Sequence, residues 1–193
     1  MARKKIEFRP DPTGHDWVGK LRLTPLQKKS LLKWVLYSLV CLTGLVLQDS
    51  MLARLRIFGG GFDVTPALIV LICVLEGSEN GSVFALAASM IYVFSGTGQG
   101  HYCIILLTAA AVAAALFRQG YLRRSAGSDL ICVGGAMIFY EMALLTAGVL
   151  QGLTYRGRWP VFLMTAIIST LAVGAVYALV KYIGTTGGNA WKE

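Results

Sequence analysis

The stretch VTPALIVLICVLEGSENGSVFALAASMIYVFSGTG, from Val64 to Gly98, decides the fold. Two short apolar runs are separated by the acidic, glycine-containing turn EGSENG. The second run has no polar face at the 3.6-residue spacing that a surface helix of a soluble protein shows. Instead it carries small residues at every fourth position, namely Gly81, Ala85 and Ser89. This pattern is typical of helices that pack inside a membrane.

The composition agrees with a membrane protein. Of the 193 residues, 55% are hydrophobic and 15% are charged, and the mean hydropathy is +0.62. We therefore expect one all-α, polytopic membrane domain over residues 30–183, with a basic and disordered cytoplasmic tail at 1–29 and a short tail at 184–193. No aromatic and basic surface motif accompanies the excess of Lys and Arg. The charges favour contact of the N-terminal tail with anionic lipid, and we expect no nucleic-acid partner.

Length limits where the helices lie, because a span needs about 20 residues at about 1.5 Å each. We predict six transmembrane helices, near residues 31–48, 66–76, 81–95, 101–117, 129–152 and 160–182. The second and third reach only about 17 and 22 Å. This pair either thins the bilayer locally or forms a partly inserted hairpin that its neighbours bury. Residues 50–58 form either a short interfacial helix or an extension of the first helix.

The Lys and Arg residues are distributed unevenly along this topology. If the N-terminus is cytoplasmic, fourteen of the 18 lie on the cytoplasmic side, and the other four are Arg54, Arg56, Arg156 and Arg158. Positive residues concentrate in the cytoplasmic loops of membrane proteins. We therefore predict that both termini are cytoplasmic.

Glu141, which follows Tyr140, is a candidate intramembrane polar site, because it falls in the middle of the fifth predicted helix. A charge at that depth costs roughly 2.5 to 3.5 kcal/mol. We expect Glu141 to face the bundle interior, either protonated or hydrogen-bonded to hydroxyl groups such as those of Tyr92, Thr165 or Ser169. Its role is open between a contact with a ligand, proton or partner and a polar clasp between helices.

The small residues Gly81, Ala85 and Ser89, together with Pro66, are the second candidate site. Such residues let helix backbones approach closely. They serve either packing inside the bundle or contact with another membrane protein.

The sequence does not favour catalysis. His15 lies in the N-terminal tail and His101 at a helix edge, and we expect Glu76 and Glu79 to share a solvated turn. The four cysteines lie in different apolar spans without metal or redox spacing, so we interpret them as small hydrophobic residues. We expect no enzyme, no metal and no cofactor.

The order of several elements resembles a known family. These elements are Leu47-Gln-Asp-Ser50, a short amphipathic piece, a glycine turn, Pro66-Ala-Leu68, Leu75-Glu-Gly77, and the small residues Gly81, Ala85, Ala88 and Ser89. Together they resemble the rod shape-determining protein MreD. An arginine-rich loop and Tyr140-Glu141 are similar to members of that family from Clostridia-type bacteria. The resemblance covers about residues 35–182.

The resemblance implies a noncatalytic inner-membrane subunit of the cell-elongation machinery. Such a subunit would bind the bitopic protein MreC and, through it, the MreB filament and the cell-wall synthases. It further implies a six-helix fold similar to the vitamin-binding S-components of energy-coupling-factor transporters. That similarity supplies an alternative function, substrate capture for such a transporter. Glu141 and the loop 49–65 would then line the substrate pocket.

Overall fold

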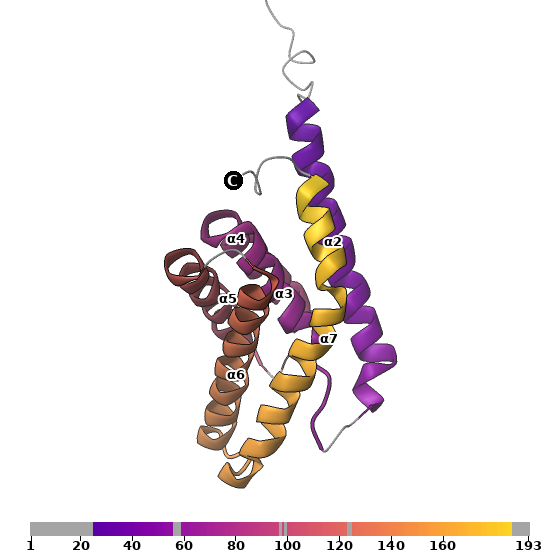
Figure 1. Ribbon diagram of the computed structural model, residues 1–193. Coiled ribbons are helices and arrows are strands. Elements are labelled where there is room, and N and C mark those ends of the chain that lie inside the picture. Colours follow the sequence, from indigo (N-terminus) through magenta and orange to yellow (C-terminus); the bar gives the residue numbers. More distant parts are fainter. Residues whose placement is uncertain (1–24, 56–58, 97, 99, 123–124, 187–193) are drawn as a thin grey trace, which may run out of the picture.

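The computed structural model describes residues 25–55, 59–96, 98, 100–122 and 125–186, and within them the chain is almost entirely helical (Figure 1). The six α-helices are, in chain order, α2 (Pro25–Ser50), α3 (Val64–Glu76), α4 (Ser78–Phe94), α5 (Tyr102–Tyr121), α6 (Ala126–Leu150) and α7 (Trp159–Thr186). Short 3₁₀ turns follow α2 at Leu52–Arg54 and precede α7 at Arg156–Arg158. The predicted all-helical class is confirmed, and a helix is present at each of the six predicted positions.

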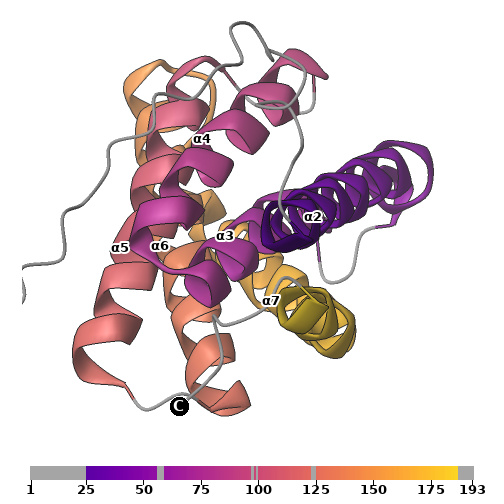
Figure 2. The ribbon, with the colours of Figure 1, turned by 90° about the horizontal axis from the view of Figure 1, so that it is seen from above.

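Helix α3 lies at the centre of the bundle. Twelve of its thirteen residues are buried, and it contacts α2, α4, α5, α6 and α7. Figure 2 shows it between α4, α5 and α6 on one side and α2 and α7 on the other. A helix that is apolar all round is expected to be buried in this way. The neighbouring helices therefore bury α3, the first helix of the short pair.

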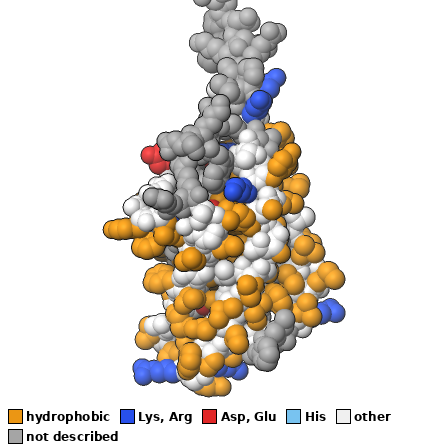
Figure 3. Space-filling view, in the orientation of Figure 1, with side chains coloured by type: hydrophobic (Ala, Val, Ile, Leu, Met, Phe, Trp, Pro, Cys, Tyr) orange, Lys and Arg blue, Asp and Glu red, His pale blue; other side chains and the backbone are white. Residues whose placement is uncertain are grey.

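Helices α2, α5, α6 and α7 are long and apolar enough to cross a membrane. Large apolar side chains cover much of the lateral surface (Figure 3), and Val83, Ile105 and Leu171 are 70%, 74% and 72% exposed. A contiguous apolar surface of this kind suits a lipid environment rather than water. The N-terminal end of α2 and the C-terminal end of α7 lie at the same end of the bundle (Figure 1).

One glycine joins α3 to α4. Gly77 has a φ of +92°, and its backbone N–H donates to the carbonyl oxygen of Cys73 at 2.9 Å. A side chain at Gly77 would also meet Gln119, because a Cβ atom would lie 2.5 Å from Nε2. The turn is therefore tighter than predicted, and residues 78–80 belong to α4 rather than to a connection.

Two further predictions about boundaries need correction. Helix α2 begins at Pro25, inside the segment expected to be tail, because residues 25–29 continue its helical turns. Of the two alternatives for residues 50–58, neither is seen over the described part, since α2 ends at Ser50 and only the short 3₁₀ turn at Leu52–Arg54 follows. The predictions for residues 1–24, 56–58 and 187–193 lie outside the described residues.

Candidate functional site

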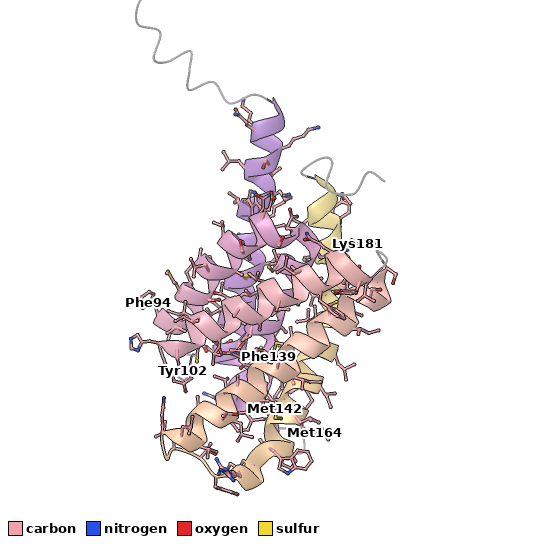
Figure 4. The ribbon with its side chains drawn as sticks, turned by 90° about the vertical axis from the view of Figure 1, so that its left-hand side faces the viewer. Phe94, Tyr102, Phe139, Met142, Met164 and Lys181 are labelled. Carbon is pink, nitrogen blue, oxygen red and sulfur yellow. The ribbon has the colours of Figure 1, made fainter. Side chains whose placement is uncertain are left out.

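A polar cavity of about 480 Å³ opens at the end of the bundle where α2 ends and α7 begins; we call it the end cavity. Figure 4 labels Met142 on α6 and Met164 on α7, which are the neighbours in sequence of the lining residues Glu141 and Thr165. The cavity is lined by side chains from α2, α4, α6, α7 and the segment before α3: Gln48, Leu52, Gly59, Gly61, Phe62, Asp63, Tyr92, Glu141, Leu144, Arg158, Val161, Phe162 and Thr165.

Asp63 is the first of two acidic residues in the end cavity. Its Oδ1 accepts hydrogen bonds from Gln48 Nε2 at 2.5 Å and from the hydroxyl of Tyr92 at 3.0 Å. Its backbone N–H donates to Ser169 Oγ at 2.8 Å. Asp63 occupies the N-cap position of α3 without making a side-chain capping bond. The carboxylate therefore ties α2 and α4 together at the cavity wall.

Residues 59–63 pack against α7 and form part of the cavity floor. The backbone N–H of Gly61 donates to Thr165 Oγ1 at 3.1 Å. Gly60 lies so close to α7 that a Cβ atom there would be 3.1 Å from Met164 Cβ. Gln48 fixes the end of the segment, because its Oε1 accepts from the backbone N–H of Thr65 at 2.9 Å. The segment is thus held in place at several points.

Glu141 is the second acid of the end cavity and comes from α6. It is 2% exposed, which confirms that it faces the interior. Its Oε1 is buried and accepts no hydrogen bond from the residues that the structure describes. Of the two alternatives for Glu141, a hydrogen bond from one of the three expected hydroxyl groups is not made to Oε1. Tyr92 donates to Asp63, Thr165 donates to the carbonyl oxygen of Val161, and Ser169 accepts from the backbone of Asp63.

Tyr140 does not share the cavity with Glu141. Its side chain is 1% exposed and belongs to the hydrophobic core of the bundle. Adjacent residues of a helix point in directions about 100° apart. The structure therefore separates the two neighbours that the sequence places together.

One cation lies at the rim of the end cavity. Arg158 is exposed, and its guanidinium carbon lies 5.4 Å from the centre of the Tyr155 ring. It stands seven residues before Thr165, which corresponds to about 10 Å along a helix axis. Among the described residues that line it, the cavity thus combines two acids, Asp63 and Glu141, with one basic side chain, Arg158.

A buried ion pair joins α2 to α3 at the opposite end of the bundle. Lys33 Nζ donates to Glu76 Oε2 at 2.5 Å, and the hydroxyl of Tyr37 donates to Glu76 Oε1 at 2.8 Å. The side chains of Lys33 and Glu76 are 9% and 2% exposed. The prediction that Glu76 lies in a solvated turn is therefore wrong, because α2 covers it. Glu79 is exposed as predicted.

A second ion pair lies at the same end and was not predicted. Arg118 Nε lies 2.6 Å from Asp129 Oδ1, and Arg118 Nη1 donates to the carbonyl oxygen of Val74 at 2.9 Å. The hydroxyl of Tyr177 donates to Asp129 Oδ2 at 2.7 Å. This group connects α3, α5, α6 and α7. The sequence did carry a signal for this pair. Arg118 lies in the last turn of the apolar helix α5, and Asp129 lies in the first turn of the next apolar helix, α6.

The small residues of the predicted stripe lie inside the bundle. Ala85 and Ser89 are fully buried. A Cβ atom at Gly81 would lie 2.8 Å from the carbonyl oxygen and 2.9 Å from the Cα of Cys73 on α3. Pro66 is also buried, in the first turn of α3, where a missing N–H costs no helical hydrogen bond. The close contact at Gly81 is packing between α3 and α4.

A lateral groove of about 390 Å³ runs between α5 and α6; we call it the α5–α6 groove. Its floor and walls are mostly alanine, glycine and other apolar residues: Ala110, Ala113, Ala114, Phe117, Ile131, Cys132, Gly135, Ala136 and Phe139. At Gly135 a Cβ atom would meet nothing within 4 Å. The groove therefore has open space at Gly135, and its lining includes the exposed aromatic side chains of Phe117 and Phe139.

The four cysteines are free and buried. Within the described ranges there is no group of three or more His, Cys, Asp or Glu side chains that could hold a metal ion.

Comparisons with protein-family models, with curated proteins and with solved structures give no match for this chain.

Proposed function

We propose that this chain is a noncatalytic scaffold subunit of the cell-elongation machinery of a bacterial inner membrane, of the MreD type. It would bind an MreC-like bitopic membrane protein and so help to link MreB filaments to peptidoglycan synthases. The sequence support is the resemblance over about residues 35–182. The structural support is the α5–α6 groove, which offers a transmembrane helix a place to dock.

Helix association in lipid depends on close packing, since lipid tails are as apolar as leucine. Small side chains at the contact allow that approach. The lining of the α5–α6 groove supplies Ala113, Ala114 and Gly135, and it includes Phe117 and Phe139, which are 54% and 58% exposed. A single partner helix with a bulky apolar ridge would fill this space. The single span of a bitopic protein has that form.

The proposal includes an orientation with both termini in the cytoplasm. The bias of Lys and Arg supports it. In this orientation the end with the pairs Lys33–Glu76 and Arg118–Asp129 is cytoplasmic. The end cavity then opens toward the outer face of the membrane.

The test is recovery of partners from the native membrane. A tagged protein would be extracted in mild detergent, and the copurifying proteins would be identified by mass spectrometry. Gly135→Leu should fill the groove without a clash, because that position is open. Ala175→Leu on the exposed surface of α7 is the matched control. We expect the wild type and the control to recover an MreC-like protein and cell-wall polymerases, and Gly135→Leu to recover at least about tenfold less.

Equal recovery by Gly135→Leu would exclude the α5–α6 groove as the contact surface. Absence of elongation proteins from the wild-type preparation would contradict the scaffold function itself.

The end cavity favours a second candidate function. Glu141 and part of the loop 49–65 do line one cavity, as a substrate-capture subunit with an S-component-like fold would require. In that case the same preparation would contain a transmembrane coupling protein and paired ATPases in place of elongation proteins.

A further inference from the structure

We propose that the end cavity binds the protonated amine of a small organic ligand between Asp63 and Glu141. This inference goes beyond the scaffold function, because the site lies in a different part of the protein from the α5–α6 groove.

Glu141 supplies the main argument. A buried acceptor without a donor costs free energy, and a charged one costs more. Oε1 of Glu141 is such an acceptor among the described residues, and it belongs to a residue that lines the cavity. The hydroxyl protons of Tyr92 and Thr165 are already used by Asp63 and by the carbonyl oxygen of Val161. A ligand in the cavity can supply the missing donor.

The carboxylate of Asp63 is already oriented by hydrogen bonds, so it can accept from the same ammonium group. Gln48 and Tyr92 fix one carboxylate oxygen of Asp63, and Ser169 fixes its backbone. A site whose side chains are already oriented loses less conformational entropy on binding. The ammonium group has three N–H donors and no acceptor, so it matches two carboxylates.

The size and walls of the cavity favour an organic amine over a metal ion. About 480 Å³ lies in the range of small-molecule pockets. Leu52, Phe62, Leu144 and Phe162 provide apolar surface for a hydrocarbon body. A bound Ca²⁺ takes six to eight oxygen ligands. The described residues provide no cluster of three or more metal-binding side chains here.

Arg158 restricts the ligand further. Its positive charge at the rim would repel a second ammonium group near the mouth of the cavity. A monoamine should therefore bind better than a diamine of similar length.

The test uses the purified full-length protein in detergent and measures its thermal unfolding. The probe is n-butylammonium chloride, compared with n-butanol and with potassium chloride at the same ionic strength. We expect a saturable rise of the unfolding temperature with the amine alone. Glu141→Gln should lower the apparent affinity at least about tenfold, since the ammonium then bonds to a neutral amide oxygen in place of a charged carboxylate. Glu79→Gln, which changes an exposed acid, should leave it unchanged.

Asp63→Asn provides a second variant if Glu141→Gln does not fold, and the wild-type comparison of amine with alcohol needs no variant. No saturable response to the amine would overturn the proposal. So would an equal response to butanol, or a larger response to magnesium or calcium chloride. No partner protein is present in this measurement, so its result is independent of the pull-down.

Discussion

Lys33 and Glu76 lie 43 residues apart in the sequence, and in the fold Nζ of Lys33 lies 2.5 Å from Oε2 of Glu76. At the far end of α2, Gln48 bonds both Asp63 and the backbone of Thr65. In an 18-residue apolar stretch of α2, only 22% of the residues are buried inside the bundle. Polar contacts at both ends therefore hold a helix whose sides face mostly outward.

Lys33→Met should destabilise the protein, because Glu76 would remain buried without its cation. Removing one partner of a buried pair typically costs about 3 to 5 kcal/mol. The free energy of unfolding would be measured by chemical denaturation in micelles. The double variant Lys33→Met/Glu76→Leu should recover most of the loss. Lys28→Met, at an exposed position of the same helix, is the control. A double variant no better than the single one would contradict this account.

Gly81→Ala should weaken the contact between α3 and α4. The added Cβ would lie 2.8 Å from a backbone oxygen and 2.9 Å from a backbone carbon of Cys73, so the helices must move apart. Overpacking of this kind costs about 1 to 3 kcal/mol. Gly120→Ala, where a Cβ meets nothing within 4 Å, should be neutral or slightly stabilising. Equal unfolding temperatures for the two variants would contradict this prediction, because they would show that α3 and α4 can accommodate the added methyl group without loss of stability.

Glu141→Leu should insert and fold normally, and in the absence of ligand its unfolding temperature should equal or exceed that of the wild type. The reason is that Oε1 accepts no hydrogen bond from the described residues. Burying such an acceptor costs about 1 to 3 kcal/mol of desolvation free energy, and the substitution by Leu removes this cost. Asp63→Ala should have the opposite effect, because Gln48 and Tyr92 lose their acceptor. Unfolding of Glu141→Leu would show instead that Glu141 supports the bundle.

The orientation can be tested with two single cysteines at opposite ends of α6. Gln151→Cys should react with a membrane-impermeant maleimide in intact spheroplasts, and Gly127→Cys should react only after permeabilisation. Both positions are exposed, whereas the four native cysteines are buried and should give little background. The reverse pattern would place the termini outside the cytoplasm.

Apolar runs and turn residues in the sequence predict the helices well. Each of the six predicted helices is present, and the shortness of 66–76 indicates a helix that cannot span alone. The contacts between distant residues could not be predicted in the same way. The pairing of Arg118 with Asp129 depends on how two helix ends meet, which the spacing along one helix does not encode.

The candidate site shows the same division. The depth of Glu141 in an apolar helix predicts its burial, because lipid is an unfavourable environment for a carboxylate. Asp63 was missed, although an acid directly before Val64-Thr65-Pro66 has the position of a helix cap. Its side chain turns instead toward Gln48 and Tyr92, because the end of α2 and the face of α4 lie beside it.

The central position of α3 has a consequence for how the protein is made. Four of the five helices around it are later in the chain, so during synthesis α3 leaves the ribosome before most of its surroundings exist. Thirteen residues, about 20 Å of helix, are too short to remain stably across a bilayer alone. Helix α3 therefore lacks part of its packing surface until α7 has been translated. Chains that terminate before α7 should be degraded rather than accumulate in the membrane.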